Sequence, residues 1–176
     1  MDYKEFKVCI FGDGGVGKTT LTHRYLTGVF KDTYKTTIGM DFYIKKLEIN
    51  GSKLSMQIWD FAGEEKFRFL LKSSLIGAQG TIFMYDITRY STFKNLNNWF
   101  EVFTEVNEIE KQTVPIILVG AKLDLKEARA VSKEHAIEYS KNLGCTEFLE
   151  CSSKTGEQVN KVFESMGRIM IKTSKS

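Results

Sequence analysis

The sequence is poor in the features of secreted, membrane-spanning and disulfide-bonded proteins. Its 176 residues include one proline and three cysteines, Cys9, Cys145 and Cys151, an odd number without the spacing of a metal site. The longest apolar stretches, 81–85 and 114–121, are as long as strands, whereas a membrane-spanning helix needs about 20 apolar residues. The N-terminal segment has no apolar signal core. We therefore expect a cytoplasmic protein with reduced thiols.

The chain also has no large excess of charge of one sign. The chain has 25 Lys and Arg against 22 Asp and Glu, a net charge of +3, and its longest basic run is Lys45-Lys46. Proteins that bind nucleic acid gather basic residues on one surface, so we expect no nucleic-acid partner. Apolar residues make up 42% and charged residues 27%, which excludes a disordered chain. Without linkers or repeats, we expect residues 1–176 to form one domain.

Alternating strand-like and helical segments predict an α/β fold. Short apolar runs predict strands at 6–11, 41–49, 53–60, 81–87, 116–121 and 146–150. The segments between and after them predict helices at 18–27, 66–75, 91–107, 132–142 and 156–172. Asn50-Gly51 is a strong hairpin signal, so the second and third strands should pair antiparallel. We expect a six-stranded, mostly parallel sheet with helices on both faces and ligands at the carboxyl ends of its strands.

Residues 12–19 form a pattern typical of a phosphate-binding loop. They fit G-x-x-x-x-G-K-[ST] and lie between a predicted strand and a predicted helix. Glycines let backbone N–H groups point at phosphate oxygens, and the helix N-terminus adds about half a positive charge. Lys18 would reach the β- and γ-phosphates, and the Thr19 hydroxyl would ligate Mg²⁺. The pattern leaves kinase, ATPase and GTPase open and predicts nucleotide contacts from Asp13 (through its backbone), Gly14, Gly15, Val16, Gly17, Lys18, Thr19 and Thr20.

Three further segments, each after a predicted strand, favour a GTPase. Asp60 follows the third strand and can hold the metal through water, and the nearby Gly63 N–H can meet a γ-phosphate. Asp124 follows the fifth strand and can accept two hydrogens from guanine, which adenine cannot offer. Residues 152–154 follow the sixth strand and place backbone N–H groups near a base carbonyl. Each segment alone could be a solvated loop, but together they indicate a guanine nucleotide site.

With these motifs, the sequence resembles the Ras-like small GTPases, and the Rab branch most closely, over residues 6–172. The Rab-like segments are 38–42, 65–68, 85–88, 91–96 and Trp99. The resemblance implies a P-loop GTPase domain that acts as a GTP/GDP switch in vesicle and membrane traffic. It would bind GTP·Mg²⁺ and hydrolyse GTP slowly to GDP and phosphate.

The resemblance also implies roles for individual residues. Residues near 31–40 would form the first switch, in which Thr37 contacts Mg²⁺ and the γ-phosphate only when GTP is bound, and 61–75 would form the second. Phe30 would pack against guanine. The further nucleotide-binding residues are Phe30, Tyr34, Thr37, Gly63, Lys122, Asp124, Ser152, Ser153 and Lys154. The implied metal ligands are Thr19, Thr37 and Asp60, and the implied catalytic residues are Lys18, Thr37, Gly63 and Glu64.

The implied partners are proteins and the nucleotide. An exchange factor, an activating protein and effectors would bind through 31–42, Trp59 and 61–75. The first switch contains no arginine that could act in cis, so acceleration would need one from the activating protein. Rab proteins usually end in a tail with prenylated cysteines, and no cysteine follows Cys151. We expect a monomer whose membrane association stays open, peripheral on the cytosolic face if the native chain is longer.

Glu64 departs from the family pattern, which has glutamine here. A glutamine can accept from the attacking water and donate to a phosphoryl oxygen, whereas an ionised glutamate can only accept. Repulsion from the triphosphate at ~4 Å would cost about 1 kcal/mol in water and about 4 at an effective dielectric of 20. The hydrolysis step would then be roughly five-fold to thousand-fold slower. Alternatively Glu64 points into solvent and contributes nothing, and both alternatives predict slow intrinsic turnover.

Two other departures concern affinity and partners. Ala121 stands where the family usually has asparagine or threonine, a side chain that helps tie the base loop to the P-loop. Losing one or two hydrogen bonds costs ~1–3 kcal/mol, or about ten- to hundred-fold in affinity, so we expect guanine preference with faster nucleotide exchange. Ser74 stands where a tyrosine should complete an aromatic trio with Phe42 and Trp59. We therefore expect that ordinary Rab effectors do not recognise this surface.

Two other functions stay open at this point. The protein could be a hydrolysis-poor binding module that stays in the GTP form and recruits effectors, because Glu64 disables hydrolysis. It could also be a P-loop kinase for a small molecule, but the sequence shows neither an arginine-rich lid nor an acceptor pocket.

Overall fold

The computed structural model describes residues 3–32, 35–67 and 69–174. Six strands form one sheet in the order β2-β3-β1-β4-β5-β6. Strands β2 and β3 pair antiparallel, and the other neighbouring strands are parallel. This confirms the predicted α/β fold. The strands are β1 (Lys4–Phe11), β2 (Met40–Ile49), β3 (Ser52–Phe61), β4 (Gly80–Asp86), β5 (Ile116–Ala121) and β6 (Glu147–Cys151).

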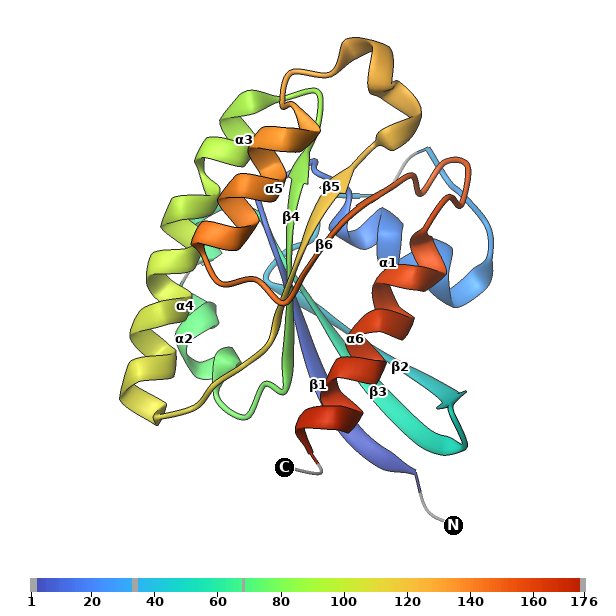
Figure 1. Cartoon of the computed structure of the whole chain (residues 1–176), viewed down its shortest axis with the longest axis vertical. Helices are drawn as coiled ribbons and strands as arrows, with labels where there is room; N and C mark the ends of the chain where they lie inside the picture. Colours follow the sequence, from blue (N-terminus) through green and yellow to red (C-terminus); the bar gives the residue numbers. More distant parts are fainter. Residues whose placement is uncertain (1–2, 33–34, 68, 175–176) are drawn as a thin grey trace.

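Helices cover both faces of the sheet, as Figure 1 shows. One face carries α1 (Lys18–Thr27) and α6 (Val159–Thr173). The other carries α2 (Phe69–Leu75), α3 (Tyr90–Lys94), α4 (Leu96–Glu110) and α5 (Lys133–Asn142). Two 3-10 segments complete the chain, η1 (Glu65–Phe67) and η2 (Leu123–Ala128).

Two apolar cores, one on each face, hold the helices to the sheet. Successive residues of a strand point to opposite faces, so each strand contributes to both cores. On β1, Val8 and Ile10 lie in the core under α1 and α6, whereas Cys9 and Phe11 lie in the core under the other helices. Strands that are buried on both faces are apolar, which explains why the segments of β4 and β5 show no polar alternation.

The predicted helix 66–75 is the 3-10 segment η1 followed by the short helix α2, and two further predicted helices also differ from the structure. The predicted helix 91–107 is two helices, α3 and α4, which meet at Asn95. The last helix begins only at Val159, because Gln158 has a φ of +57° and lies outside the helical region. Apolar periodicity shows neither feature, since it reports which face of a segment is buried and not where the backbone turns.

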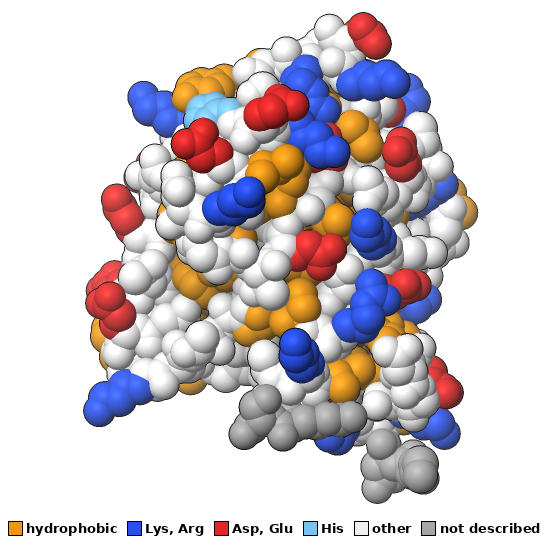
Figure 2. All heavy atoms as spheres, viewed as in Figure 1, with side chains coloured by type: hydrophobic (Ala, Val, Ile, Leu, Met, Phe, Trp, Pro, Cys, Tyr) orange, Lys and Arg blue, Asp and Glu red, His pale blue; other side chains and the backbone are white. Residues whose placement is uncertain are grey.

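Acidic and basic side chains are interspersed over the face shown in Figure 2. The net charge of +3 is therefore not gathered into one basic patch on this face. Among the helices of the described ranges, none combines the length and the apolar character needed to cross a membrane.

Arg129 joins the loop after η2 to β6 through an ion pair whose carboxylate is buried. Its Nη1 and Nη2 donate to Oε1 and Oε2 of Glu150 at 2.6 and 3.0 Å. Nη1 also donates to the carbonyl of Val131 at 3.1 Å. The Glu150 side chain is only 4% exposed, so water cannot replace the guanidinium.

We expect Arg129→Ala to lower the free energy of unfolding by about 3 kcal/mol, because Glu150 is left buried without its partner. The measurement is the urea midpoint at constant m-value. Arg168→Ala is the matched control, since the Arg168–Glu164 pair spans 3.9 Å and both side chains are about half exposed. That loss should stay below about 1 kcal/mol. Equal losses in the two variants would contradict the assignment of a stabilising buried pair.

Candidate nucleotide-binding site

A cavity of about 460 Å³ lies where β1, β3, β5 and β6 end. Most residues that the sequence predicts for the site line it: Gly14, Gly15, Val16, Gly17, Lys18, Thr19, Thr20, Phe30, Thr37, Gly63, Glu64, Lys122, Asp124, Ser153 and Lys154. Asp13, Asp60 and Ser152 do not line it but contact the loops that do. Tyr34 lies outside the described residues.

The turn from β1 into α1 forms the floor of the cavity. Gly12 has a φ of +148°, and a Cβ there would collide with the carbonyl oxygen of Met84. The turn can therefore lie against β4 only with glycine at this position. Helix α1 begins at Lys18, so the N–H groups of its first turn face the cavity.

Lys18 is folded back into this turn. Its Nζ donates to the carbonyls of Gly12 at 2.7 Å and Asp13 at 2.9 Å, and the residue is 6% exposed. Burial lowers the pKa of Lys18 to about 8, although the Asp60 and Asp13 carboxylates oppose this shift. A buried ammonium at the floor of a cavity suits an anionic ligand, because phosphate oxygens would compensate its desolvation.

Three oxygen-bearing side chains meet beside α1. The Thr19 hydroxyl lies 2.8 Å from the Thr37 hydroxyl and donates to Oδ2 of Asp60 at 2.5 Å. Oδ1 of Asp60 is buried and has no hydrogen-bond partner among the described residues. Burial raises the pKa of Asp60 to about 6, against the hydrogen bond from Thr19 and the charge of Lys18. Two hydroxyls and a carboxylate with an unpaired oxygen fit a small hard cation such as Mg²⁺, which prefers oxygen ligands.

Gly63 lies directly against the phosphate-binding loop. A Cβ at Gly63 would overlap the backbone of Gly14 and Asp13, so a larger residue could not make this approach. Glu64 follows and lines the cavity, while its Oε2 pairs with Nζ of Lys66 at 2.8 Å. The Glu64 side chain is 42% exposed. The structure therefore places Glu64 at the cavity wall and not wholly in solvent.

The opposite side of the cavity is built around Asp124. Its Oδ1 accepts a hydrogen bond from Oγ of Ser152 at 2.6 Å, and the same Oγ accepts from the Thr155 N–H at 3.1 Å. Ser152 is fully buried, so it fixes the Asp124 carboxylate from behind. The sequence predicted only backbone contacts for residues 152–154, whereas the structure shows this side-chain role for Ser152.

The sequence model of the Ras family matches residues 7–172 of the chain. The chain belongs to the Ras family of small GTPases. It is 38% identical over 169 residues to Ras-related protein Rab-13 of Canis lupus familiaris, covering 96% of this chain and 81% of that protein. It is 42% identical over 161 residues to Ras-related protein RABC1 of Arabidopsis thaliana, covering 92% and 74%. It is 38% identical over 164 residues to Ras-related protein SEC4 of Saccharomyces cerevisiae, covering 93% and 74%. These matches confirm the Rab-like resemblance.

This Ras-family protein exposes apolar side chains beside the cavity. The Phe42 and Trp59 rings meet edge to face with centroids 5.5 Å apart, and Nζ of Lys7 lies 4.1 Å from the centre of the Trp59 ring. Ser74 is half-buried and offers no ring to this pair. In the segments 38–44 and 69–76, Ile38, Ile44, Phe69 and Ile76 are also exposed. The two rings of the predicted trio are thus together, and the third position is polar.

Sequence reasoning missed how this Ras-family protein anchors its phosphate-binding loop. The Asp13 carboxylate, expected to contribute only backbone, accepts from Nδ2 of Asn95 at 2.7 Å and Nε1 of Trp99 at 2.9 Å. These donors lie 82 and 86 residues further along the chain. No local pattern could pair them, because both contacts form only in the folded chain.

We expect Ser152→Ala to release bound GDP about ten-fold faster, because the Asp124 carboxylate loses its buried donor. The measurement is the dissociation rate of a fluorescent GDP analogue in excess Mg²⁺ and unlabelled GDP. Ser165→Ala is the matched control: Ser165 is also buried and donates to a carboxylate, that of Glu147, at 3.4 Å, far from the cavity lining. A Ser152→Ala rate within two-fold of wild type would refute this role.

The same assay tests the sequence-based expectation for Ala121, which is buried and lines the cavity. An Ala121→Asn variant should release GDP more slowly than wild type, since asparagine restores a polar side chain next to the base. If the two proteins release GDP equally slowly, the expectation of faster exchange is wrong.

Proposed function

We propose that this protein is a Rab-like switch in membrane traffic. Its single G domain would bind GTP·Mg²⁺, signal through residues 31–40 and 61–75, and hydrolyse GTP slowly to GDP and phosphate. One observation carries the proposal: the cavity brings together the phosphate-binding loop, Thr37, Gly63 and Asp124 from four separate parts of the chain. The relatives named Rab-13, RABC1 and SEC4 support the Rab-like assignment.

Switching would depend on the terminal phosphate of GTP. Thr37 and Gly63 lie at the cavity next to Lys18 and the backbone of residues 13–19, where a triphosphate would end. A γ-phosphate could accept from the N–H groups of both residues and so hold the two segments in one arrangement. After hydrolysis these acceptors are lost and the segments are released.

Thr19, Thr37 and Asp60 are the residues that would hold Mg²⁺. The unpaired buried oxygen of Asp60 and the 2.8 Å separation of the two hydroxyls support this assignment. When bound there, Mg²⁺ would offset negative charge on the β- and γ-phosphates. Because Thr37 belongs to the first switch segment, its hydroxyl would link that segment to the nucleotide.

Asp124 would select guanine. Its carboxylate can accept two hydrogens from the N1–H and the 2-amino group of guanine, and Ser152 orients it for this purpose. Phe30 and Lys122 also line the cavity and would pack against the base, and residues 153–154 would donate backbone N–H groups. Adenine offers no matching pair of donors, so the site favours GTP and GDP.

Hydrolysis would rest on charge stabilisation. Lys18 and the residues of the phosphate-binding loop line the cavity, where the Lys18 ammonium and the loop N–H groups would stabilise charge on the transferring phosphoryl group. Glu64 lies where a residue could contact the attacking water, but an ionised carboxylate there accepts hydrogen bonds only and repels the phosphates. Turnover would therefore be slow until an activating protein supplies an arginine.

Effectors would bind on residues 31–42, Trp59 and 61–75. The exposed Phe42 ring and the half-buried Trp59 ring offer an apolar contact surface, and the half-buried serine at 74 would exclude partners that require a third ring there. We further propose that the protein acts as a monomer at the cytosolic face of membranes.

The nucleotide released by denaturing the purified protein tests the proposal. We expect GDP, identified by ion-exchange chromatography, because a working switch hydrolyses its GTP during purification. Bound GTP would instead favour the hydrolysis-poor binding module. Neither guanine nucleotide, together with no binding of added GDP, would reject the proposed function.

A second prediction tests whether Glu64 is the residue that limits the rate of GTP hydrolysis. We expect Glu64→Gln to raise single-turnover GTP hydrolysis five-fold or more, because glutamine removes the repulsion and can donate to a phosphoryl oxygen. Glu65→Gln, which removes one neighbouring charge from η1, is the control and should stay within two-fold of wild type. An unchanged rate in Glu64→Gln would show that Glu64 does not limit hydrolysis.

A further inference from the structure

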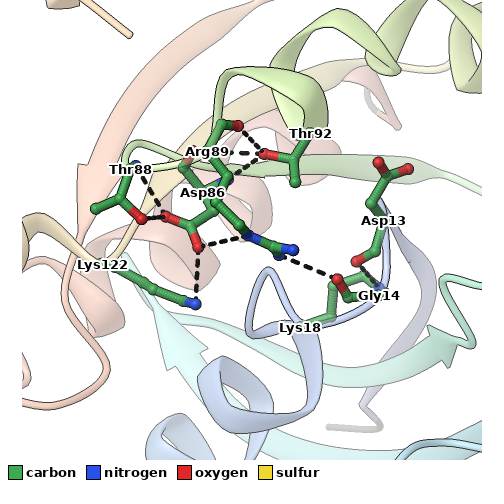
Figure 3. A network of polar contacts seen from close by, with 8 residues as sticks. All are labelled: Asp13, Gly14, Lys18, Asp86, Thr88, Arg89, Thr92 and Lys122. Carbon is green, nitrogen blue, oxygen red and sulfur yellow. Dashed lines mark hydrogen bonds and ion pairs between the residues drawn. The ribbon is translucent and has the colours of Figure 1, made fainter. Parts of the chain in front are cut away.

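One buried carboxylate at the end of β4 gathers donors from three residues, as Figure 3 shows. Asp86, 1% exposed, accepts from the N–H and hydroxyl of Thr88 at 2.9 and 2.7 Å. It also accepts from Nε of Arg89 at 3.1 Å and Nζ of Lys122 at 2.7 Å. Burial raises the pKa of Asp86, but the hydrogen bonds from Lys122 and Thr88 outweigh it and lower the pKa below its ordinary value. Asp86 is thus a fixed anionic centre.

Arg89 extends this centre to the phosphate-binding loop. While Nε binds Asp86, Nη2 donates to the carbonyl of Gly14 at 3.1 Å. In Figure 3 the guanidinium spans the gap between Asp86 and the loop. A Cβ placed on Gly15 would lie 3.4 Å from the same Nη2, so Arg89 is next to both glycines. Within the described chain the cavity lining does not include Arg89, so it contacts the loop from outside the cavity.

Lys122 connects the same centre to the base side of the cavity. Its backbone has a φ of +69°, and its side chain both lines the cavity and reaches Asp86. The preceding residue, Ala121, has a methyl group that can form no hydrogen bond. A continuous polar connection therefore runs from Gly14 through Arg89 and Asp86 to Lys122, and it bypasses position 121.

We propose that Arg89 is a positioning residue for nucleotide binding, which couples the phosphate-binding loop to the base-binding loop (residues 122–124) in place of the polar side chain that Ala121 lacks. The proposal rests on the proposed function, because it assigns the two loops to one nucleotide. Arginine suits the role since its planar fork presents Nε and Nη2 to two acceptors at once, whereas a lysine ammonium on a flexible stem would not hold both in one geometry. Without Arg89, the loop around Gly14 would open more readily and the nucleotide would leave faster.

The first test is the dissociation rate of fluorescent GDP from four proteins: wild type, Arg89→Ala, Arg89→Lys and Arg168→Ala. We expect Arg89→Ala to release GDP about ten-fold faster than wild type. Arg89→Lys keeps the charge but should still be at least three-fold faster, because it cannot form both bonds. Arg168→Ala removes one positive charge on α6, far from the cavity, and should match wild type. An Arg89→Ala rate within two-fold of wild type, or a wild-type rate for Arg89→Lys, would overturn the proposal.

The second test measures coupling between Arg89 and Lys122 in a double-mutant cycle. If Arg89 acts through Asp86 and Lys122, the ten-fold effect of Arg89→Ala should shrink below three-fold when Lys122 is already alanine. A ten-fold effect in both backgrounds would mean independent action and would overturn the proposal. Urea unfolding of the nucleotide-free Arg89→Ala variant should match wild type, since this side chain is 44% exposed, and a large loss of stability would instead indicate a general structural role.

Failure of the proposed function gives a different result. In that case wild-type protein itself would retain no guanine nucleotide, and no dissociation rate could be measured. If wild type retains GDP and Arg89→Ala retains it equally well, the switch proposal stands and only the role of Arg89 is wrong.

Discussion

The ammonium of Lys18 lies inside the turn between β1 and α1, held by the carbonyls of Gly12 and Asp13, and the rest of the site is arranged around this enclosed charge. Burying an ammonium is costly unless acceptors surround it, so the turn has to keep its shape. Its shape depends on the close approach of Gly12 to β4 and of Gly63 to Gly14, which side chains at these two glycines would prevent. The phosphate-binding loop is thus a rigid element that other segments contact.

Aspartates fix those contacts. Asp13 receives donors from α4 and from the residue just before it, and Asp60 receives one from α1. Asp86 receives donors from the loops after β4 and β5, and Asp124 from the residue that follows β6. Each carboxylate lies at or just beyond the carboxyl end of a strand. The parallel sheet brings these ends to one edge, so short side chains can link segments that are distant in sequence. Asp60 Oδ1 differs from these paired oxygens, because it is buried and has no hydrogen-bond partner in the described chain, and it is the atom best placed for a cation.

Much of this arrangement could be predicted, because strong local patterns produced it. Six apolar runs, the Asn50-Gly51 turn and the glycine-rich loop led to the sheet, the hairpin and the cavity in the places where the structure has them. Helix boundaries were less well predicted at Asn95, which lies between α3 and α4, and at Gln158, whose positive φ lies outside the helical region. The spacing of apolar residues carries no information on either of these two helix boundaries.

The sequence by itself determined the fold class, the phosphate-binding loop and most of the predicted residues that line the cavity, because these depend on local spacing and on the residue types that phosphate and guanine require. Only the tertiary structure decided how those side chains are held. The contacts of Asp13 with Trp99, of Ser152 with Asp124 and of Arg89 with Gly14 join residues that are 28 to 86 positions apart. Such pairs form only when the sheet sets the strand ends side by side, and no spacing along the chain encodes them.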